Sequence, residues 1–176
     1  GGTVVVDAGD APVDPDGDTF RLEATADEIT GTSGDDLFRA RISQNQNGEQ
    51  TNELGTGDYI DGGAGDDELF ATVQDASALN GDPESEIAPI TVGVETIRIT
   101  AQQAGSSDDE DAIEISAEEM YGVEQIISYR SDADLTFYNV NTLTDEPTPG
   151  GNVDEGARST DNIEICMEYT AGDNGL

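Results

Sequence analysis

Apolar and polar residues alternate in short runs along this chain, with the period of two that is typical of β-strands with one buried face. The clearest early run is TFRLEATA, Thr19 to Ala26, in which we expect Phe20 and Leu22 to point inward. Clusters of Gly, Asp, Ser and Pro interrupt such runs every few residues, as turns do. The pattern therefore predicts a succession of short strands joined by turns.

The second half of the chain continues this pattern. Its predicted strands are ITVGVETIRIT (90–100), DAIEIS (111–116), GVEQIISY (122–129), DLTFYNV (134–140) and DNIEICMEY (161–169). The near-copies GVETI at Gly93 and GVEQI at Gly122 suggest successive coils of a repeating architecture. Helical signal is limited to SAEEMYG (116–122), where Ser116 and Glu119 could form a capping box around one short helix. The expected fold class is all-β.

Two turn motifs separate the early strands: GTSGDDLF from Gly31 to Phe38, and GGAGDDELF from Gly62 to Phe70. The intervening TGDYID (56–61) is a weaker copy that keeps Asp58 and Ile60 in phase. The polar stretch SQNQNGEQTNE (43–53) predicts a loop. For the whole chain we expect an N-terminal strand and linker over residues 1–18 and one module over 19–176, part of a longer protein.

Acidic residues dominate the composition, with 40 Asp and Glu against 6 Arg and no Lys, for a formal net charge of −34. So many carboxylates repel one another, and bound cations or high ionic strength relieve that repulsion. Acidic surfaces without Lys also occur in proteins from saline water, which is a second explanation of the charge. Nucleic acid is excluded as a plausible partner, and the absence of a long apolar segment argues against membrane insertion.

The sequence contains no His, so Ser-His-Asp hydrolysis, Cys-His proteolysis and His-rich zinc sites are excluded within this chain. Cys166 is the single cysteine and cannot form an internal disulfide. Acidic pairs such as Glu118 and Glu119 resemble a glycosidase pair only superficially, because charge runs in loops are usually solvated. We therefore expect a protein that is not an enzyme.

GGAGDDELF carries the most specific chemistry. It matches the nonapeptide Gly-Gly-x-Gly-x-Asp-x-apolar-x at every specified position, and GTSGDDLF matches it with Thr32 in place of the second glycine. The glycines permit a tight turn whose peptide carbonyls converge, and the Asp adds a carboxylate. Several hard oxygen ligands in a flexible cage suit calcium better than magnesium or zinc.

At these residues the chain resembles the repeats-in-toxin family, in which tandem nonapeptides wind into a parallel β-roll, or β-solenoid, with calcium between stacked turns. The order of motifs and strands over Thr19 to Tyr169 is similar to the calcium-binding domains of large type I-secreted bacterial surface-layer and adhesin-type proteins. The resemblance implies Ca²⁺ ligands from two stacked turns and from the weaker copy: Gly31, Ser33, Asp36, Asp58, Gly63, Gly65 and Asp67. The long stretch after Ile42 departs from the regular coil of two nonapeptides.

The resemblance implies a secreted, extracellular module at the bacterial cell surface, whose partners are calcium ions and further copies of itself. The expected function is a structural subunit of a surface layer, filament or extracellular matrix. Two alternatives stay open: a calcium-rigidified adhesin module, and the accessory β-roll of a secreted hydrolase.

Overall fold

Strands joined by tight turns make up all regular secondary structure in the residues that the computed structural model describes, which are 17–44, 48, 50–74, 87–103, 113–140, 142–143, 158–159 and 163–168. Residues 1–16 of the N-terminal strand and linker expected over 1–18 lie outside them. The all-β expectation is confirmed for the described residues. No helix among them is long and apolar enough to cross a membrane.

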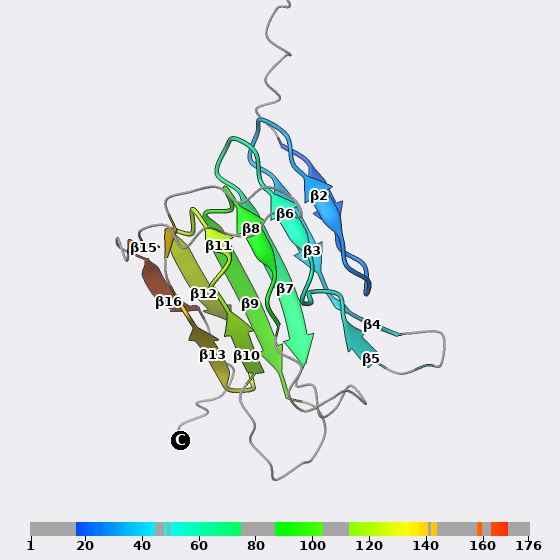
Figure 1. The fold of residues 1–176 in the computed structure, drawn as a ribbon. Helices are drawn as coiled ribbons and strands as arrows, with labels where there is room; N and C mark the ends of the chain where they lie inside the picture. Colours follow the sequence, from blue (N-terminus) through cyan, green and yellow to red (C-terminus); the bar gives the residue numbers. More distant parts are fainter. Residues whose placement is uncertain are drawn as a thin grey trace, which may run out of the picture.

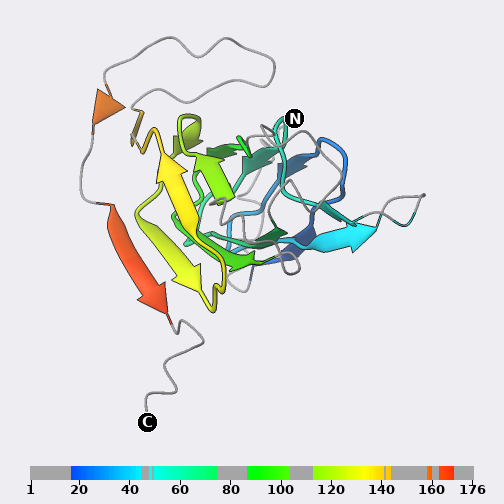
Figure 2. The same cartoon turned by 90° about the horizontal axis from the view of Figure 1, so that it is seen from below.

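The larger sheet has six strands, and each neighbouring pair is parallel. In spatial order these strands are β1 (Thr19–Arg21), β3 (Leu37–Ala40), β7 (Glu68–Gln74), β9 (Thr96–Gln102), β12 (Gln125–Tyr129) and β16 (Glu164–Glu168). Spatial order follows chain order, so β1 and β16 are its two edges. Figure 2 shows the blue N-terminal strands and the red β16 on opposite sides of the molecule.

A second parallel sheet has four strands in the order β11 (Met120–Tyr121), β8 (Ile90–Val92), β6 (Tyr59–Asp61) and β2 (Glu28–Thr30). Each of its strands leads through one turn into a strand of the larger sheet: β2 into β3, β6 into β7, β8 into β9 and β11 into β12. We call each such pair with its turn a rung. The chain advances by one strand spacing, about 4.8 Å, from rung to rung, and the rungs follow one another across Figure 1.

The hydrophobic core lies on the inward face of the larger sheet. In β7 and β9 every second residue is buried, as the alternating sequence pattern predicts. The parallel register aligns the buried residues of successive strands in one column: Phe38, Leu69, Ile97 and Ile126. Burying one such side chain stabilises the fold by about 1.5–3 kcal/mol, so the column links the rungs energetically.

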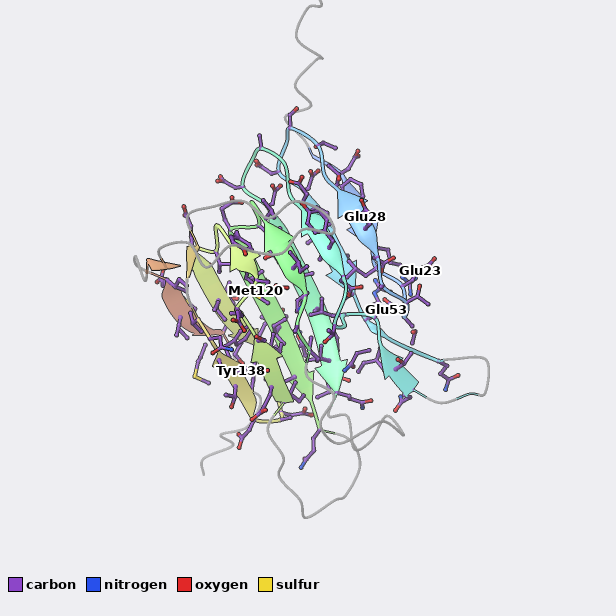
Figure 3. The ribbon with its side chains drawn as sticks, viewed as in Figure 1. Glu23, Glu28, Glu53, Met120 and Tyr138 are labelled. Carbon is purple, nitrogen blue, oxygen red and sulfur yellow. The ribbon has the colours of Figure 1, made fainter. Side chains whose placement is uncertain are left out.

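Three two-stranded sheets complete the described fold, and two of them are formed by strands from its C-terminal half. Strands β10 (Ile113–Ser116) and β13 (Leu135–Tyr138) are parallel, and an isolated bridge joins Ile87 to Ile115. Strands β14 (Thr142–Leu143) and β15 (Arg158–Ser159) are antiparallel. In Figure 3 the labelled Met120 and Tyr138 lie toward this C-terminal end, whereas Glu23, Glu28 and Glu53 lie at the β2 end.

Two local predictions are wrong. The polar stretch 43–53 predicts a loop, but residues at both of its ends belong to the antiparallel strands β4 (Ile42–Gln44) and β5 (Gln50–Asn52). Main-chain hydrogen bonds do not require apolar side chains, so a polar hairpin carries little hydrophobic signal. The short helix expected over 116–122 is instead the end of β10, a turn and β11, because Met120 and Tyr121 pair with β8 and are buried.

A matched pair of substitutions tests the core column. Ile97 is fully buried, whereas Ile165, on the β16 edge of the same column, is 72% exposed. We expect Ile97→Ala to lower the free energy of unfolding by about 2–5 kcal/mol, because it opens a cavity. Ile165→Ala should change it by less than about 1 kcal/mol. Urea denaturation of dilute protein measures both, and equal losses would contradict the packing described.

Candidate functional site

The two glycine-rich turns lie directly against each other. Gly31 to Asp36 connects β2 to β3, and Gly62 to Asp67 connects β6 to β7. The amide of Ala64 donates to the carbonyl of Thr32 at 3.3 Å. The stretch between the two turns adds the β4–β5 hairpin, which leaves the rung at one end, so it does not prevent stacking. Figure 1 shows this hairpin extending away from the two sheets.

Oxygen atoms from neighbouring rungs converge beside Gly31 and Gly62. A Cβ placed on Gly31 would lie 2.2 Å from the Gly62 carbonyl oxygen and 2.4 Å from Asp36 Oδ2. A Cβ on Gly62 would lie 1.9 Å from the Gly93 carbonyl oxygen and 2.4 Å from Asp67 Oδ2. Glycine is required at both positions because any side chain would occupy the point that these oxygens face.

A column of carboxylates runs through the turns. The amide of Asp18 donates to Asp36 Oδ1 at 2.6 Å, the amide of Asp36 donates to Asp67 Oδ1 at 2.7 Å, and the amide of Asp67 donates to Glu95 Oε2 at 2.8 Å. Each side chain thus bonds the backbone of the preceding turn. Asp36 and Asp67 are only 2% and 1% exposed, so these carboxylates are internal parts of the fold rather than surface charges.

One oxygen in this column has no hydrogen-bond partner among the described residues. Both oxygens of Asp36 accept hydrogen bonds, Oδ1 from the Thr32 hydroxyl and Oδ2 from the Thr32 amide. In the next turn Gly63 replaces Thr32, and its amide donates to Asp61 Oδ1 instead, at 3.1 Å. Asp67 Oδ2 is therefore buried without a hydrogen bond. An unsatisfied buried carboxylate oxygen is costly unless a cation or proton compensates it.

Electrostatics at Asp67 agree with this geometry. Burial raises the pKa of Asp67 from 3.8 to about 6, and the negative charges of Glu95, Asp36 and Asp35 add to the rise. An elevated pKa shows that the site disfavours an uncompensated negative charge. A bound cation would reverse that preference, since it attracts the same carboxylate that its neighbours repel.

Asp58 lies at the other end of β6, before the strand rather than after it. The intervening residues put it about 13 Å along the chain from Gly62. Its Oδ1 accepts from the Asp27 amide at 2.9 Å and its Oδ2 from the Gly55 amide at 2.8 Å. Burial raises the pKa of Asp58. Both of its oxygens are satisfied by backbone amides, which is the arrangement of a turn-stabilising residue.

The remaining predicted ligands lie in two different environments. Gly63 and Gly65 face the first turn, where Cβ atoms would meet the carbonyl oxygens of Thr32 and Gly34 at 2.1 and 2.6 Å. Ser33 lies exposed between those two residues.

Glu95, Gly93 and Gly62 contribute to the stacked turns but are absent from the predicted ligand set. A regular spacing is the signal that could have identified them: Asp36 and Asp67 are 31 residues apart, and Gly31, Gly62 and Gly93 repeat at the same interval. Glu95 is harder to find, because the shorter third turn places it 28 residues after Asp67.

Side chains alone do not form a metal centre here. Within the described residues, no three His, Cys, Asp or Glu side chains gather closely enough to hold an ion. A cation beside Gly31 or Gly62 would therefore depend on peptide carbonyls supplemented by one carboxylate oxygen at each position. Carbonyl and carboxylate oxygens are the donors that calcium prefers, so the residues present fit that ion.

Comparison of the chain with protein-family models, with curated proteins and with solved structures finds no match.

The raised pKa of Asp67 predicts a pH effect in calcium-free buffer. Because the folded state holds this proton more tightly than the unfolded chain, the stabilisation is full below about pH 4 and is lost as pH rises through about 6. The melting temperature should therefore fall between about pH 5 and pH 7.5. Two variants isolate the contribution of Asp67. Asp67→Asn should show a smaller fall than Asp66→Asn, whose residue is exposed. Equal falls would contradict the assignment.

Proposed function

We propose that this chain is a calcium-binding β-solenoid module of a secreted bacterial cell-surface protein. The observation that carries the proposal is the buried, unpartnered Asp67 Oδ2, which faces the same point as the Gly93 carbonyl oxygen. A calcium ion would supply the positive charge that this oxygen lacks. The parallel rungs support a solenoid, since each adds one strand to each sheet.

Two stacked junctions are proposed as calcium positions. The first uses the Gly62 carbonyl and Asp36 Oδ2, and the second uses the Gly93 carbonyl and Asp67 Oδ2. The second has the stronger support, because both oxygens of Asp36 already accept hydrogen bonds from Thr32. Carbonyls facing Gly63 and Gly65 lie along the same turns. Calcium would thus act structurally, joining one rung to the next.

Matched variants test the calcium proposal. We expect Asp67→Asn to weaken calcium binding about tenfold or more in titration calorimetry, because it removes a charged ligand. Asp66→Asn removes one adjacent charge from an exposed residue and should have little effect. In wild type, chelation should lower the melting temperature by on the order of 5–10 °C, because an ion at 100 times its Kd stabilises by about 2.7 kcal/mol.

Two results would contradict this function. Equal loss of affinity in Asp67→Asn and Asp66→Asn would mean that diffuse negative charge, rather than a defined site, attracts calcium. An unchanged melting temperature after exhaustive chelation in low-salt buffer would mean that the fold does not require the ion.

We also propose that the module assembles with further copies of itself into a surface layer or filament. Support comes from β16, where Ile165 and Met167 are each 72% exposed, the large apolar residues of the described chain that stand out on its surface. Ile165 continues the buried column of Ile97 and Ile126, but no further strand of the six-stranded sheet follows it. An edge strand with unpaired backbone groups can accept another strand.

The expected occupant is the β1 edge of a second copy. There Phe20 occupies the same inward column, because it pairs with Phe38, and it stacks on that ring at 5.2 Å. Placing β1 beside β16 would continue the sheet in the same parallel sense. Calcium would assist by reducing repulsion between bodies that each carry a formal charge of −34.

Assembly is tested by sedimentation and electron microscopy with and without calcium. We expect calcium-dependent oligomers or fibres for the wild type and their loss in Ile165→Lys, which places a charge in the edge column. Thr136→Lys, an exposed position on β13, is the matched control and should still assemble. A wild type that stays monomeric at high concentration in calcium would refute self-assembly and favour the adhesin alternative.

The proposed role is structural rather than enzymatic. The accessory β-roll of a secreted hydrolase is the remaining alternative, and it would use the same calcium positions. A catalytic partner elsewhere in a longer protein would distinguish it from a surface-layer subunit.

A further inference from the structure

The outward face of the six-stranded sheet collects the arginines of this acidic chain. Arg21, Arg39 and Arg98 lie in one outward column, together with Phe70. Arg41 follows directly after β3, and Arg130 stacks on Tyr129 at 5.1 Å. The chain has only six basic residues, so this face concentrates nearly all of its positive charge.

The arginines differ in how they are compensated. Arg21 pairs with Glu53 at 2.8 Å, and Arg98 pairs with both Glu68 and Glu168 at 2.8 Å. Within the described residues neither Arg39 nor Arg41 forms an ion pair. Arg39 instead lies over the ring of Phe70, at 5.4 Å from its centroid. Two cationic groups near the cavity-forming strands thus lack a carboxylate partner among the described residues.

A cavity of about 390 Å³ lies beside these two arginines. It is lined by Arg39, Ala40, Arg41, Ile42, Phe70, Thr72 and Gln102. Its wall forms where β3 runs into β4, the first strand of the inserted hairpin. The insertion thus gives this rung a recess that a plain stack of strands and turns would lack. Its volume falls in the range of small-ligand sites, about 300–1,000 Å³.

We propose that this cavity binds an acidic saccharide, a sugar that carries a carboxylate or sulfate group. Arg39 and Arg41 would bind the anionic group, because guanidinium groups form bidentate, charge-assisted hydrogen bonds to such oxygens. Thr72 and Gln102 offer hydrogen bonds to hydroxyl groups. Phe70 and Ile42 offer apolar contact to the C–H face of a sugar ring.

The net charge of the protein does not prevent this binding. At physiological ionic strength the Debye length is about 8 Å, so acidic residues farther than this from the cavity are largely screened. Glu68, the acidic residue next to Phe70 in the outward face, is already paired with Arg98. Glu53, whose Oε2 accepts a hydrogen bond from the Arg41 amide at 2.8 Å, is paired with Arg21. Both of these described carboxylates are therefore already compensated by other arginines.

Titration calorimetry with three oligosaccharides of similar length tests the proposal: a uronic-acid oligomer, a sulfated oligomer and an uncharged oligomer. Calcium is held constant throughout, because uronates also bind that ion. We expect at least one anionic oligomer to bind and the uncharged one to bind at least tenfold more weakly. The preference between the two anionic oligomers identifies whether carboxylate or sulfate is the natural group.

Variants localise the binding. Arg39→Gln with Arg41→Gln should reduce affinity for the anionic oligomer by about tenfold or more, since two charge-assisted contacts are removed. Thr72→Val gives a milder second probe within the same cavity, and Arg130→Gln is the control on the same face outside the cavity. Circular dichroism checks that each variant is folded. Failure of both anionic oligomers to bind the wild type, or equal affinity in the double variant and the control, would overturn the proposal.

Discussion

Stacking of the turns depends on carboxylates that accept hydrogen bonds from backbone amides, as backbone carbonyls do within the sheets. The backbone pairing between strands ends at each glycine-rich turn, which we call the corner of the rung. Without another acceptor, the amides of Asp18, Asp36 and Asp67 would have no hydrogen-bond partner there. In each case a side-chain oxygen from the following rung accepts the bond. The rungs therefore remain in register at the corner as well as within the sheets, and the core column of Phe38, Leu69 and Ile97 follows from that register.

The same hydrogen bonds also create an unfavourable electrostatic environment at the corner. A carboxylate buried to satisfy an amide carries its negative charge into the fold with it. In the first turn Thr32 offsets this charge with two hydrogen bonds to Asp36. In the second turn Gly63 has no hydroxyl, and its amide is used by Asp61. The two turns are otherwise similar, but the first has Thr32 where the second has Gly63. This difference leaves both oxygens of Asp36 hydrogen-bonded, whereas the second oxygen of Asp67 requires a cation or a proton.

Much of this arrangement could be predicted from local pattern. Period-two alternation predicted the strand that contains β9 and the inward position of Leu22, and the nonapeptide motif identified the two glycine-rich turns that stack. What failed depends on distance along the chain. Glu95 lies 28 residues after Asp67, outside either motif, and it resembles an ordinary surface glutamate until its contact with the Asp67 amide is known. Asp58 shares the motif phase of Asp67 and likewise precedes a strand, yet it lies at the far end of β6 from the Gly62–Asp67 turn, and both of its oxygens accept hydrogen bonds.

The insertion after β3 shows how such a fold can vary without losing its stack. Each rung is held in the stack by the hydrogen bonds at its corner and by strand pairing in the two sheets. Extra residues inserted at the end of a strand need not disturb either set of hydrogen bonds. Here the first coil interval, from Asp18 to Asp36, is 18 residues, two nonapeptides, whereas the next interval is 31 residues. The longer interval includes the hairpin, and the hairpin adjoins the recess between Arg41 and Phe70. The corner and the outward face are thus separated within each rung: substitutions at the corner act on cohesion between rungs, whereas insertions alter the outward surface. Such a division permits the proposed calcium positions and the proposed saccharide cavity to change independently of each other.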